Sequence, residues 1–429
     1  MTDGTHPSEL SAPTDRMSLS AQIKARTGEV RGVGSRTSKS PCYETDGLEI
    51  RVDGFTGIER LENHQVRVGA GCTLNELLNV LGRHGLALPT IGEWDGQTVG
   101  GAIATGTHGG SYKYGSLISS VVDAVLVDGN GRRRTFKRGW KNFQHVLPCF
   151  GTLGVFTEFV LQCEPSFELH LKRRVFGIDT FLERLLQPDQ STEFRSAIWM
   201  PAADFVLDYS ASRPDSPLHG VRRKREVRFN DTAMVLDWLT KQTAWVKSQV
   251  SRTDELDSVG RAYTQRLFPA RDYCGPYDAM LAPLKGDAAT ILAKRAKNKT
   301  PPEGEFAVSY AAAKPFLDAL MTDMKSLNAF PDRPIGLRPG AAEFGTLSAA
   351  QGEPCIWVSM FLYPNNPLME RLPNRLIEFS ARPHWGKCVF HRRDEIASLY
   401  PGWTDFSAFR NTLDRDRKFV NHFALSLGL

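Results

Sequence analysis

One stretch of this chain constrains its fold more than any other. Residues 98–110, TVGGAIATGTHGG, contain five glycines. Glycine loses the most conformational freedom on folding, so it is concentrated where the backbone turns tightly or where something approaches it closely. Successive glycine N–H groups also form concave sites that suit phosphate. The stretch therefore predicts close approach of a ligand or of another segment to this backbone.

The common phosphate-binding motifs do not account for this stretch. A P-loop needs Gly-Lys followed by Ser or Thr, and residues 98–110 contain no lysine. Two other glycine pairs, GVGSRTS at 32–38 and GAGCTL at 69–74, lack the third glycine of a dinucleotide-binding fingerprint. Taken alone, the stretch leaves a glycine-rich structural turn as an alternative to a phosphate site.

Length and composition indicate a globular chain of two domains. At 429 residues the chain exceeds what one ordinary hydrophobic core supports. Hydrophobic residues make up 41% and charged residues 24%, as in soluble globular proteins. No apolar run reaches the roughly 18 residues that a membrane helix needs, so we expect no membrane span. Residues 1–20 are polar and lack the apolar stretch of a secretory signal, and we expect a disordered lead there.

Cysteines and charge restrict location and partners. The seven cysteines are odd in number and widely spaced, which favours reduced thiols in the cytoplasm over a disulfide framework. The formal net charge is +5, with basic clusters at 131–141 and 221–229. Both clusters alternate with apolar residues as a solvated strand does, and neither carries an aromatic stacking platform. We therefore expect no nucleic-acid partner, and attraction of an anionic cofactor or substrate is the other use for these charges.

The first third of the chain has the pattern of an α+β unit. Residues 48–52 and 65–71 alternate apolar and polar side chains, which predicts half-buried strands. Thr73 and Glu76 have the spacing of a capping box that opens an amphipathic helix. Residues 121–136 predict two strands joined by a Gly-Asn-Gly turn.

A second unit begins at about residue 166. Residues 232–250 and 312–328 have the pattern of amphipathic helices, separated by shorter strand-like pieces. We expect residues 211–230 and 297–305, which are rich in turn-forming and charged residues, to be exposed connections.

Five blocks, in this order, are typical of one flavoprotein family. They are RGVGSRTS at 31–38, VGAGCTLNELL at 68–78, GLALPTIGEWDGQTVGGAIATGTHGG at 85–110, GTLGVFTEF at 151–159 and RPHWGK at 382–387. The chain resembles the vanillyl-alcohol-oxidase-type FAD proteins and, within them, the aldonolactone and alditol oxidase branch of gulonolactone, arabinonolactone and xylitol oxidases. The resemblance covers the first 165 and the last fifty residues well and is patchy between them.

The resemblance implies an α+β fold class, namely a two-domain PCMH-type FAD-binding fold with an α+β cap that holds the substrate. It divides the chain into the disordered lead at 1–20, an FAD-binding domain at 21–165, a cap at 166–380 and a C-terminal segment at 381–429 that returns to the FAD site. FAD is the implied cofactor.

The same resemblance implies the residues that hold FAD. One segment wraps the pyrophosphate and the flavin edge: Gly32, Val33, Gly34, Ser35, Arg36, Thr37 and Ser38. A second group surrounds the pyrophosphate, the adenosine and the ring: Gly101, Thr107, Gly110, Tyr114, Gly115, Ser116, Leu117, Val155, His384 and Lys387. On this view the glycines are present because a diphosphate and a flavin pass where side chains would obstruct them.

Catalytic residues follow from the resemblance and from the chemistry. Oxidation of an alcohol on a flavin needs hydride transfer from a C–H bond to flavin N5, while the hydroxyl loses a proton. Lys387 matches the family lysine that stabilises negative charge on the reduced ring, and His384 matches the histidine beside it. Arg338 in PIGLRPG matches an arginine that orients the substrate. Ser359 matches a substrate-facing threonine, with an ordinary buried strand serine as the alternative.

The RPHWGK block has two other interpretations. The block could be a turn with a solvated lysine. His384, Cys388 and His391 have tolerable spacing for zinc but supply only three ligands, so we expect no metal.

The chain departs from the family pattern in two places. The branch carries Glu-x-Arg in the cap, and here Gly336 stands where the glutamate is expected; Glu343 is nearby but has no assigned place. Thr37 stands where many relatives attach FAD through a histidine, and the glycine-rich run has no cysteine for a second link. FAD should therefore be bound non-covalently.

The resulting hypothesis is an FAD-dependent oxidoreductase that oxidises a CH–OH group of a sugar-like or specialised-metabolite substrate, with O2 or another electron acceptor. Two alternatives stay open: a decaprenylphosphoryl-ribose-oxidase-like enzyme acting on an anionic lipid sugar, and a flavin-binding protein without catalysis. Retention of both Lys387 and Arg338 argues against the second alternative.

Overall fold

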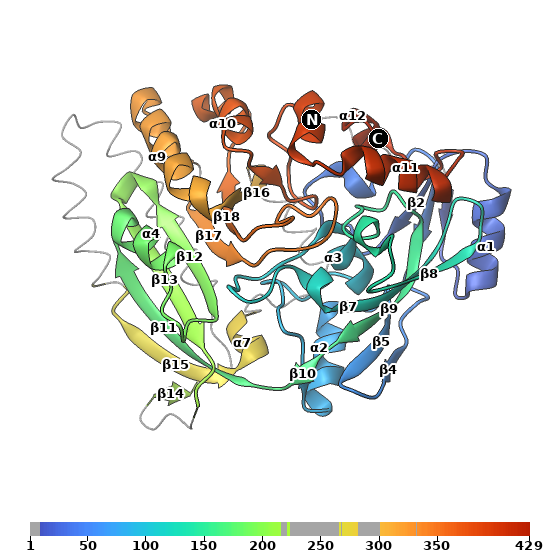
Figure 1. The fold of residues 1–429 in the computed structure, drawn as a ribbon, viewed down its shortest axis with the longest axis horizontal. Helices are drawn as coiled ribbons and strands as arrows, with labels where there is room; N and C mark the ends of the chain where they lie inside the picture. Colours follow the sequence, from blue (N-terminus) through green and yellow to red (C-terminus); the bar gives the residue numbers. More distant parts are fainter. Residues whose placement is uncertain (1–8, 216–220, 224–265, 267, 282–300, 332) are drawn as a thin grey trace.

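The structure is a computed structural model that describes residues 9–215, 221–223, 266, 268–281, 301–331 and 333–429. The chain folds into two halves that lie side by side, the N-terminal half with the C-terminal helices and a second half built on one large sheet (Figure 1). The predicted helix at 232–250 and most of the basic cluster at 221–229 lie outside the described residues.

The elements have the following bounds. The strands are β1 (Glu9–Ser11), β2 (Val30–Val33), β3 (Leu48–Arg51), β4 (Ile58–Arg60), β5 (Gln65–Gly69), β6 (Leu86–Ala87), β7 (Val121–Val127), β8 (Arg133–Lys137), β9 (Val155–Gln162), β10 (Glu164–Pro165), β11 (Glu168–Phe176), β12 (Phe194–Met200), β13 (Phe205–Ser212), β14 (Arg222–Arg223), β15 (Arg271–Pro276), β16 (Glu303–Ser309), β17 (Ile335–Gly340), β18 (Cys355–Phe361) and β19 (Arg382–Pro383). The α-helices are α1 (Arg16–Ala25), α2 (Leu74–Arg83), α3 (Val99–Thr105), α4 (Ile178–Leu186), α7 (Tyr277–Leu281), α9 (Tyr310–Leu327), α10 (Leu372–Glu378), α11 (Trp403–Leu413) and α12 (His422–Ser426). The short 3-10 helices are η1 (Pro41–Tyr43), η2 (Leu117–Ser120), η3 (Phe143–His145), η4 (Pro201–Ala203), η5 (Pro367–Glu370) and η6 (Arg393–Leu399).

The first half contains two sheets with short helices. A three-stranded sheet has the order β1-β3-β2, and a five-stranded sheet has the order β4-β5-β9-β7-β8. The capping box predicted for α2 is present, with the Thr73 side chain accepting from the Glu76 N–H and the Glu76 side chain accepting from the Thr73 N–H. The helix buries its leucine face in the core that also holds α3 and the five-stranded sheet.

The C-terminal segment packs against this first half. The Val30 N–H donates to the Lys418 carbonyl at 2.8 Å, and the Gly129 N–H donates to the Leu413 carbonyl at 2.9 Å. Helices α11 and α12 accordingly lie over the N-terminal strands rather than beside the large sheet (Figure 1). The last fifty residues thus connect the cap back to the first half.

The second half is a nine-stranded sheet with the order β14-β15-β11-β13-β12-β17-β18-β16-β19. Its helices α4, α9 and α10 pack through a buried apolar cluster on one face, to which β17 contributes Ile335 and Leu337 and β18 contributes Ile356 and Val358. Because successive side chains on a strand point to opposite faces, the alternate residues of these strands face away from the helices. That second face is the one that carries the polar residues described below.

Two expectations from the sequence were wrong. Residues 9–20 are not disordered, because β1 pairs in parallel with β3 and α1 begins at Arg16 with an Asp15 cap. Residues 303–305 are not an exposed connection, because they begin β16, which is paired with both β18 and β19. In both cases pairing with strands elsewhere in the chain orders a segment whose local sequence is polar, and the local sequence does not indicate that pairing.

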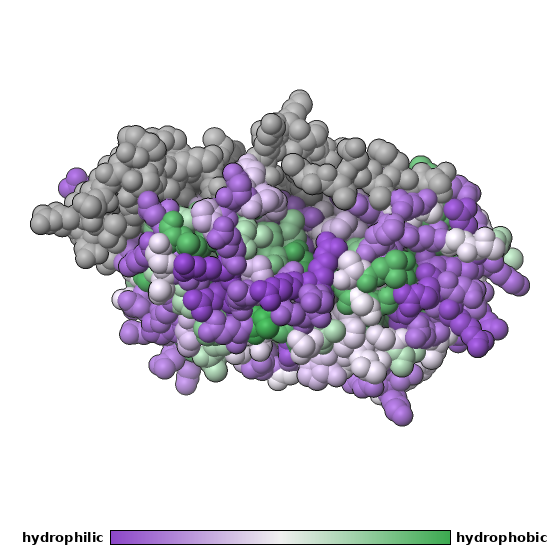
Figure 2. All heavy atoms as spheres, turned by 90° about the horizontal axis from the view of Figure 1, so that it is seen from above, coloured by the Kyte–Doolittle hydropathy of each residue, from purple (hydrophilic) through white to green (hydrophobic). Residues whose placement is uncertain are grey.

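The surface seen from above is largely hydrophilic, with apolar residues in small separate groups (Figure 2). Among the described residues, no helix combines the length and apolarity needed to cross a membrane. All seven cysteines are unpaired.

Candidate functional site

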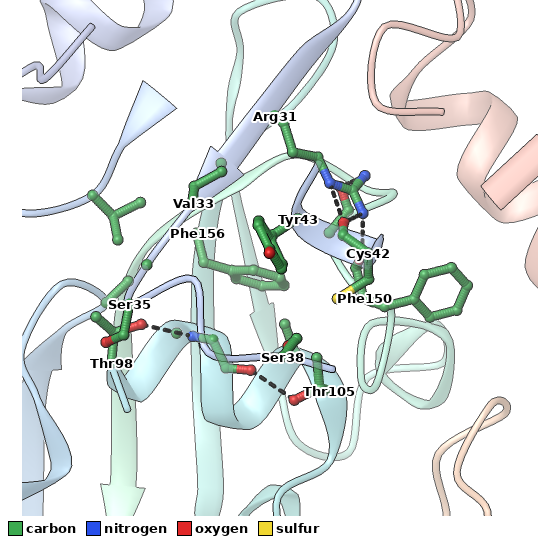
Figure 3. A pocket seen from close by; sticks show the side chains of 18 of the residues that line it. Arg31, Val33, Ser35, Ser38, Cys42, Tyr43, Thr98, Thr105, Phe150 and Phe156 are labelled. Carbon is green, nitrogen blue, oxygen red and sulfur yellow. Dashed lines mark hydrogen bonds between the residues drawn. The ribbon is translucent and has the colours of Figure 1, made fainter. Parts of the chain in front are cut away.

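An open cavity of about 740 Å³ lies in the first half, between β2 with its following loop and helix α3. Nine of the predicted cofactor residues line it, namely Gly32, Val33, Gly34, Ser35, Arg36, Thr37, Ser38, Gly101 and Val155. Figure 3 shows the loop after β2 passing over α3, with Ser35 near Thr98 and Ser38 near Thr105. We call this space the glycine-lined cavity.

Glycine is required here by close packing. A Cβ at Gly34 would lie 2.0 Å from the Thr98 Oγ1, and a Cβ at Gly100 would lie 3.0 Å from the Cβ of Ala70. Thr98 is the N-cap of α3 and accepts the Gly101 N–H at 3.2 Å, so it cannot move without loosening the helix (Figure 3). The loop and the helix are thereby held against each other with bare backbone facing the cavity.

The loop also presents backbone donors that the protein leaves free. Within the described part of the chain, the N–H groups of Ser35, Arg36, Thr37 and Ser38 donate no hydrogen bond. Consecutive unpaired N–H groups at the wall of a cavity are suited to phosphate oxygens. The cavity therefore offers an open wall of bare backbone and the donors that the diphosphate of a dinucleotide needs.

The remaining predicted residues of the glycine-rich run lie elsewhere. Thr107, Tyr114, Gly115, Ser116 and Leu117 do not line this cavity. The Thr107 side chain bonds to Gln97, and its carbonyl accepts the Leu117 N–H. These bonds fix a turn that carries the run from α3 toward the large sheet.

Gly110 touches the large sheet itself. Its carbonyl accepts the Arg195 N–H at 2.8 Å, and a Cβ there would lie 1.9 Å from the Arg195 carbonyl oxygen. Gly110 is therefore a glycine because another segment of the chain packs against it. Close approach of a ligand remains the explanation for Gly101, and close approach of a segment explains Gly110.

A cluster of buried and half-buried charges lies on the inward face of the large sheet. Strand β16 carries Glu303 and Glu305 two residues apart, which places them on the same face. Strand β17 contributes Arg338, and the segment after β19 contributes Lys387. We call these four residues, together with Lys39, His108 and His384, the charged cluster.

Each carboxylate of the cluster has two or more partners. Glu305 pairs with the Arg338 guanidinium at 2.8 Å and with the Lys387 Nζ at 3.8 Å, and the His108 Nε2 lies 3.5 Å from it. Glu303 pairs with Lys387 and, at 3.4 Å, with the Lys39 Nζ. Every member of this cluster is thus held by at least one opposite charge or hydrogen bond.

The partners decide the protonation states. Burial alone raises the pKa of Glu305, but Arg338, His108 and Lys387 outweigh it and hold this pKa well below its ordinary value. The pKa of Glu303 is lowered in the same way, against burial, by Lys387 and Lys39. Burial lowers the pKa of Lys387, yet the two carboxylates raise it above its ordinary value. At neutral pH both carboxylates are ionised and Lys387 is charged.

His384 has the opposite character. Burial lowers its pKa to about 3, so the ring is neutral at physiological pH. The ring Nδ1 of His384 accepts the Gly386 N–H at 3.0 Å. The backbone N–H of His384 donates to the Glu305 carbonyl at 2.8 Å. His108 stacks on the Trp357 ring with a centroid distance of 3.7 Å and fills the space beside it.

The position of the missing glutamate is informative. Gly336 is paired with Ser359 on β18, and Ser359 is paired with Glu305 on β16, so the three residues form one row across three strands. Glu305 bonds to Arg338, which the sequence predicts to be the arginine of the family pair. The carboxylate next to that arginine thus comes from a different strand, two strands away from Gly336.

Glu343 does not take this role. Its side chain accepts the Ser116 N–H and the Ser348 hydroxyl, and its own N–H donates to the Ala350 carbonyl at 2.9 Å. Glu343 therefore fixes the turn at Tyr114–Leu117, away from Arg338. Ser359 donates to Glu303 at 3.2 Å and so adjoins the charged cluster.

Three members of the cluster are of residue types that commonly bind metal ions. Ligand atoms of His108, Glu305 and His384 lie within 4.8 Å of one another. A cation there would meet the Arg338 guanidinium and the Lys387 ammonium, which already bind Glu305. The arrangement favours a polar or anionic group over a metal ion.

Several residues of the site were missed from the sequence. Arg31 is buried and donates to the carbonyls of Cys42, Gly151 and Phe419, tying the cavity wall to the C-terminal segment. Glu303 and Glu305 were assigned to a connection because the residues before them are rich in lysine and proline. An alternation of Glu, Phe, Val with small residues over 303–309 was the available signal for a strand.

Two known families match successive parts of the chain. Residues 21–137 match the family described as FAD binding domain. Residues 159–427, more than half of the chain, match the family described as D-arabinono-1,4-lactone oxidase.

Curated relatives align over most of their length. L-gulono-1,4-lactone dehydrogenase of Mycobacterium tuberculosis is 25% identical over 429 residues, covering 97% of this chain and 95% of that protein. Alditol oxidase of a Streptomyces species is 25% identical and covers 89% and 86%. L-gulonolactone oxidase of Mus musculus is 25% identical and covers 94% and 90%.

A similar fold occurs among solved structures. Cholesterol oxidase from B. sterolicum superposes with a TM-score of 0.73 at 16% identity, covering 97% of this chain and 93% of that chain. The likeness confirms the expected fold class, an α+β two-domain PCMH-type FAD-binding fold.

Proposed function

The chain belongs to the D-arabinono-1,4-lactone oxidase family and carries an FAD-binding domain at residues 21–137, and from this premise we propose that it oxidises a CH–OH group of a sugar-like or specialised-metabolite substrate. The resemblance to the aldonolactone and alditol oxidase branch is confirmed by its relatives, and the chain is an FAD-dependent oxidoreductase. The observation that carries the proposal is the buried contact of Arg338 with Glu305, beside Lys387.

The glycine-lined cavity is our proposed FAD site. The free N–H groups of Ser35, Arg36, Thr37 and Ser38 are the donors for its diphosphate, and Gly101 and Val155 complete the wall. The described residues that line the cavity include no histidine. This supports non-covalent binding, as Thr37 predicts.

The cluster supplies the protein's part of the reaction. FAD, when bound, is the acceptor for a hydride from the substrate carbon. Arg338 is fixed by Glu305 and donates to the substrate oxygen, and the ionised Glu305 orients the substrate hydroxyl by accepting a hydrogen bond from it. Lys387 provides a positive charge that Glu303 and Glu305 hold in a half-buried place, where it can stabilise developing negative charge. His384 is neutral and its Nδ1 accepts from Gly386, so its Nε2–H offers a hydrogen-bond donor without added charge.

The finer assignments belong to the same proposal. We place the domain boundary near residue 165, where the five-stranded sheet ends at Gln162 and the nine-stranded sheet begins at Glu168, with the cap at 166–380. The unpaired cysteines support a cytoplasmic location. O2 or another small acceptor completes the cycle.

Two measurements test the function. Acid precipitation of the FAD-loaded protein should leave a yellow supernatant over a white pellet; a yellow pellet would mean a covalent link. Aldonolactones and alditols are then added without oxygen, and at least one should bleach the visible flavin absorbance.

A matched pair of variants tests the site. Arg338→Lys should slow the bleaching about 10²-fold or more, because a lysine cannot reproduce the fixed fork of a guanidinium. Arg371→Lys, on the outer helices, should bleach at the wild-type rate. If dithionite reduces the flavin and no substrate of the panel does, the proposed oxidation is wrong.

A further inference from the structure

A second cavity, of about 500 Å³, lies on the inward face of the large sheet. It is bounded by residues of β11, β12, β13, β17 and α7 on one side and by Thr90–Glu93 and Gly109–Gly110 on the other. Arg338 belongs to this cavity as well as to the charged cluster. We call it the cap cavity, and Arg338 places it next to the proposed reaction.

Strand register divides its wall into two rows. On β13, Ala211 is paired with Leu171 of β11 and with Phe194 of β12, which makes an apolar row. Two residues along, Tyr209 is paired with Ser196 of β12. This second row is therefore polar, because Tyr209 and Ser196 both carry hydroxyl groups.

The polar groups gather at one end. Ser196 donates to Glu93 at 3.3 Å, and the Arg338 guanidinium lies 3.3 Å from the same carboxylate. Arg338 also holds Glu305, so this end of the cavity connects directly to the charged cluster. The end is fitted to a hydroxylated head group.

The other end is apolar. Leu171, Phe194 and Met280 are buried, helix α7 packs against β11 and adds Leu281 to this part of the wall, and Ile91 also lines the cavity. A polyol or sugar lactone carries polar groups along its whole length, and a buried hydroxyl without a partner costs about 1–3 kcal/mol. A bare sugar would leave the row of Leu171, Ala211 and Phe194 unused.

From this division we infer that the substrate is amphiphilic, with a hydroxylated head at Arg338 and Glu93 and an alkyl or aryl group in the apolar half of the cap cavity. The inference rests on the proposed function and names its substrate class. It sets this chain apart from an enzyme for free alditols, because binding energy comes from the apolar group as well as from the head.

The test is a binding series on the FAD-loaded protein. Methyl, butyl and octyl xylosides, below their micelle-forming concentrations, are titrated by calorimetry, and anaerobic flavin bleaching is recorded in parallel with xylitol as the bare polyol. Burial of a CH2 group contributes about 0.8 kcal/mol, so each added CH2 that enters the cavity should lower Kd about fourfold.

Two variants locate the effect. Leu281→Ser, at the half-buried wall, should flatten the dependence of Kd on chain length. Leu186→Ser, an equally half-buried leucine of α4 outside the cavity, should keep the wild-type dependence. A chain-length dependence that is the same in both variants would overturn the placement.

The outcomes separate the inference from the proposed function. Equal affinity for methyl and octyl xyloside would refute the amphiphilic substrate, while bleaching by xylitol or any xyloside would leave the oxidation standing. Tighter binding of the longer xylosides, lost in Leu281→Ser, without bleaching by any compound would support the cavity assignment and refute the oxidation.

Discussion

Replacement of Glu305 by glutamine removes the negative charge from the Arg338–Glu305 pair of the site. The Glu305 side chain is 2% exposed and lies 2.8 Å from the Arg338 guanidinium. At this separation and an effective dielectric constant of about 20, the attraction is about 6 kcal/mol. Desolvation offsets much of it, and loss of one partner from a buried pair costs about 3–5 kcal/mol. Arg338 keeps Glu93 at 3.3 Å, so we expect the lower end, about 3 kcal/mol.

The measurement is the free energy of unfolding in urea at one fixed FAD concentration, because bound cofactor contributes to stability. Glu378→Gln is the control: Glu378 pairs with Arg375 on the surface, where such a pair contributes about 0–1 kcal/mol. The double variant of Glu305→Gln with Arg338→Gln should be less destabilised than the sum of the single variants. If Glu305→Gln costs no more than Glu378→Gln, the buried pair does not stabilise the site and our argument fails.

Three further predictions concern the same residues. Lys387→Met should retain FAD, seen as an unchanged visible spectrum, and slow substrate-dependent bleaching about 10²–10³-fold; an unchanged rate would remove Lys387 from the reaction. Gly34→Ala places a Cβ 2.0 Å from Thr98 Oγ1, and this overpacking costs about 1–3 kcal/mol unless the loop shifts. The shift should lower the FAD content of the purified protein. Gly57→Ala, with no atom within 4 Å of the added Cβ, should leave the FAD content unchanged. The folded-state pKa of Glu305 is below its unfolded value of about 4.3, so its contribution to stability is complete above the unfolded pKa and is lost as pH falls toward the folded pKa. The stability of Glu305→Gln should therefore depend less on pH below about pH 5. Acid unfolding followed by circular dichroism measures this dependence.

Much of the fold could be predicted because its signals are local. The capping box at Thr73, the strand patterns at 48–52 and 65–71 and the amphipathic helix at 312–328 each appear in the structure at or near the expected residues. The loop after β2 was also assigned to the cofactor site, and all of its predicted residues line one cavity. These features depend on neighbours in sequence, so a short window contains the information.

The carboxylates of the site could not be predicted. Glu303 and Glu305 follow a stretch with the composition of a connection, and nothing local distinguishes them from solvated surface residues. They become buried because β16 is placed between β18 and β19, whose residues come more than forty positions later. Gly336, taken alone, suggested a site without a carboxylate, whereas the sheet supplies one through Glu305.

The sequence by itself determined the family, the loop that we propose binds the cofactor and the residue types at Arg338 and Lys387, since each is written in short contiguous motifs. Only the tertiary structure decided which acid stands beside Arg338, why Gly110 is a glycine and how the cap cavity divides into polar and apolar halves. The physical reason is that these properties arise from strand register. Pairing across a sheet brings together side chains that are far apart along the chain, and its energy is gained only when all the strands are in place.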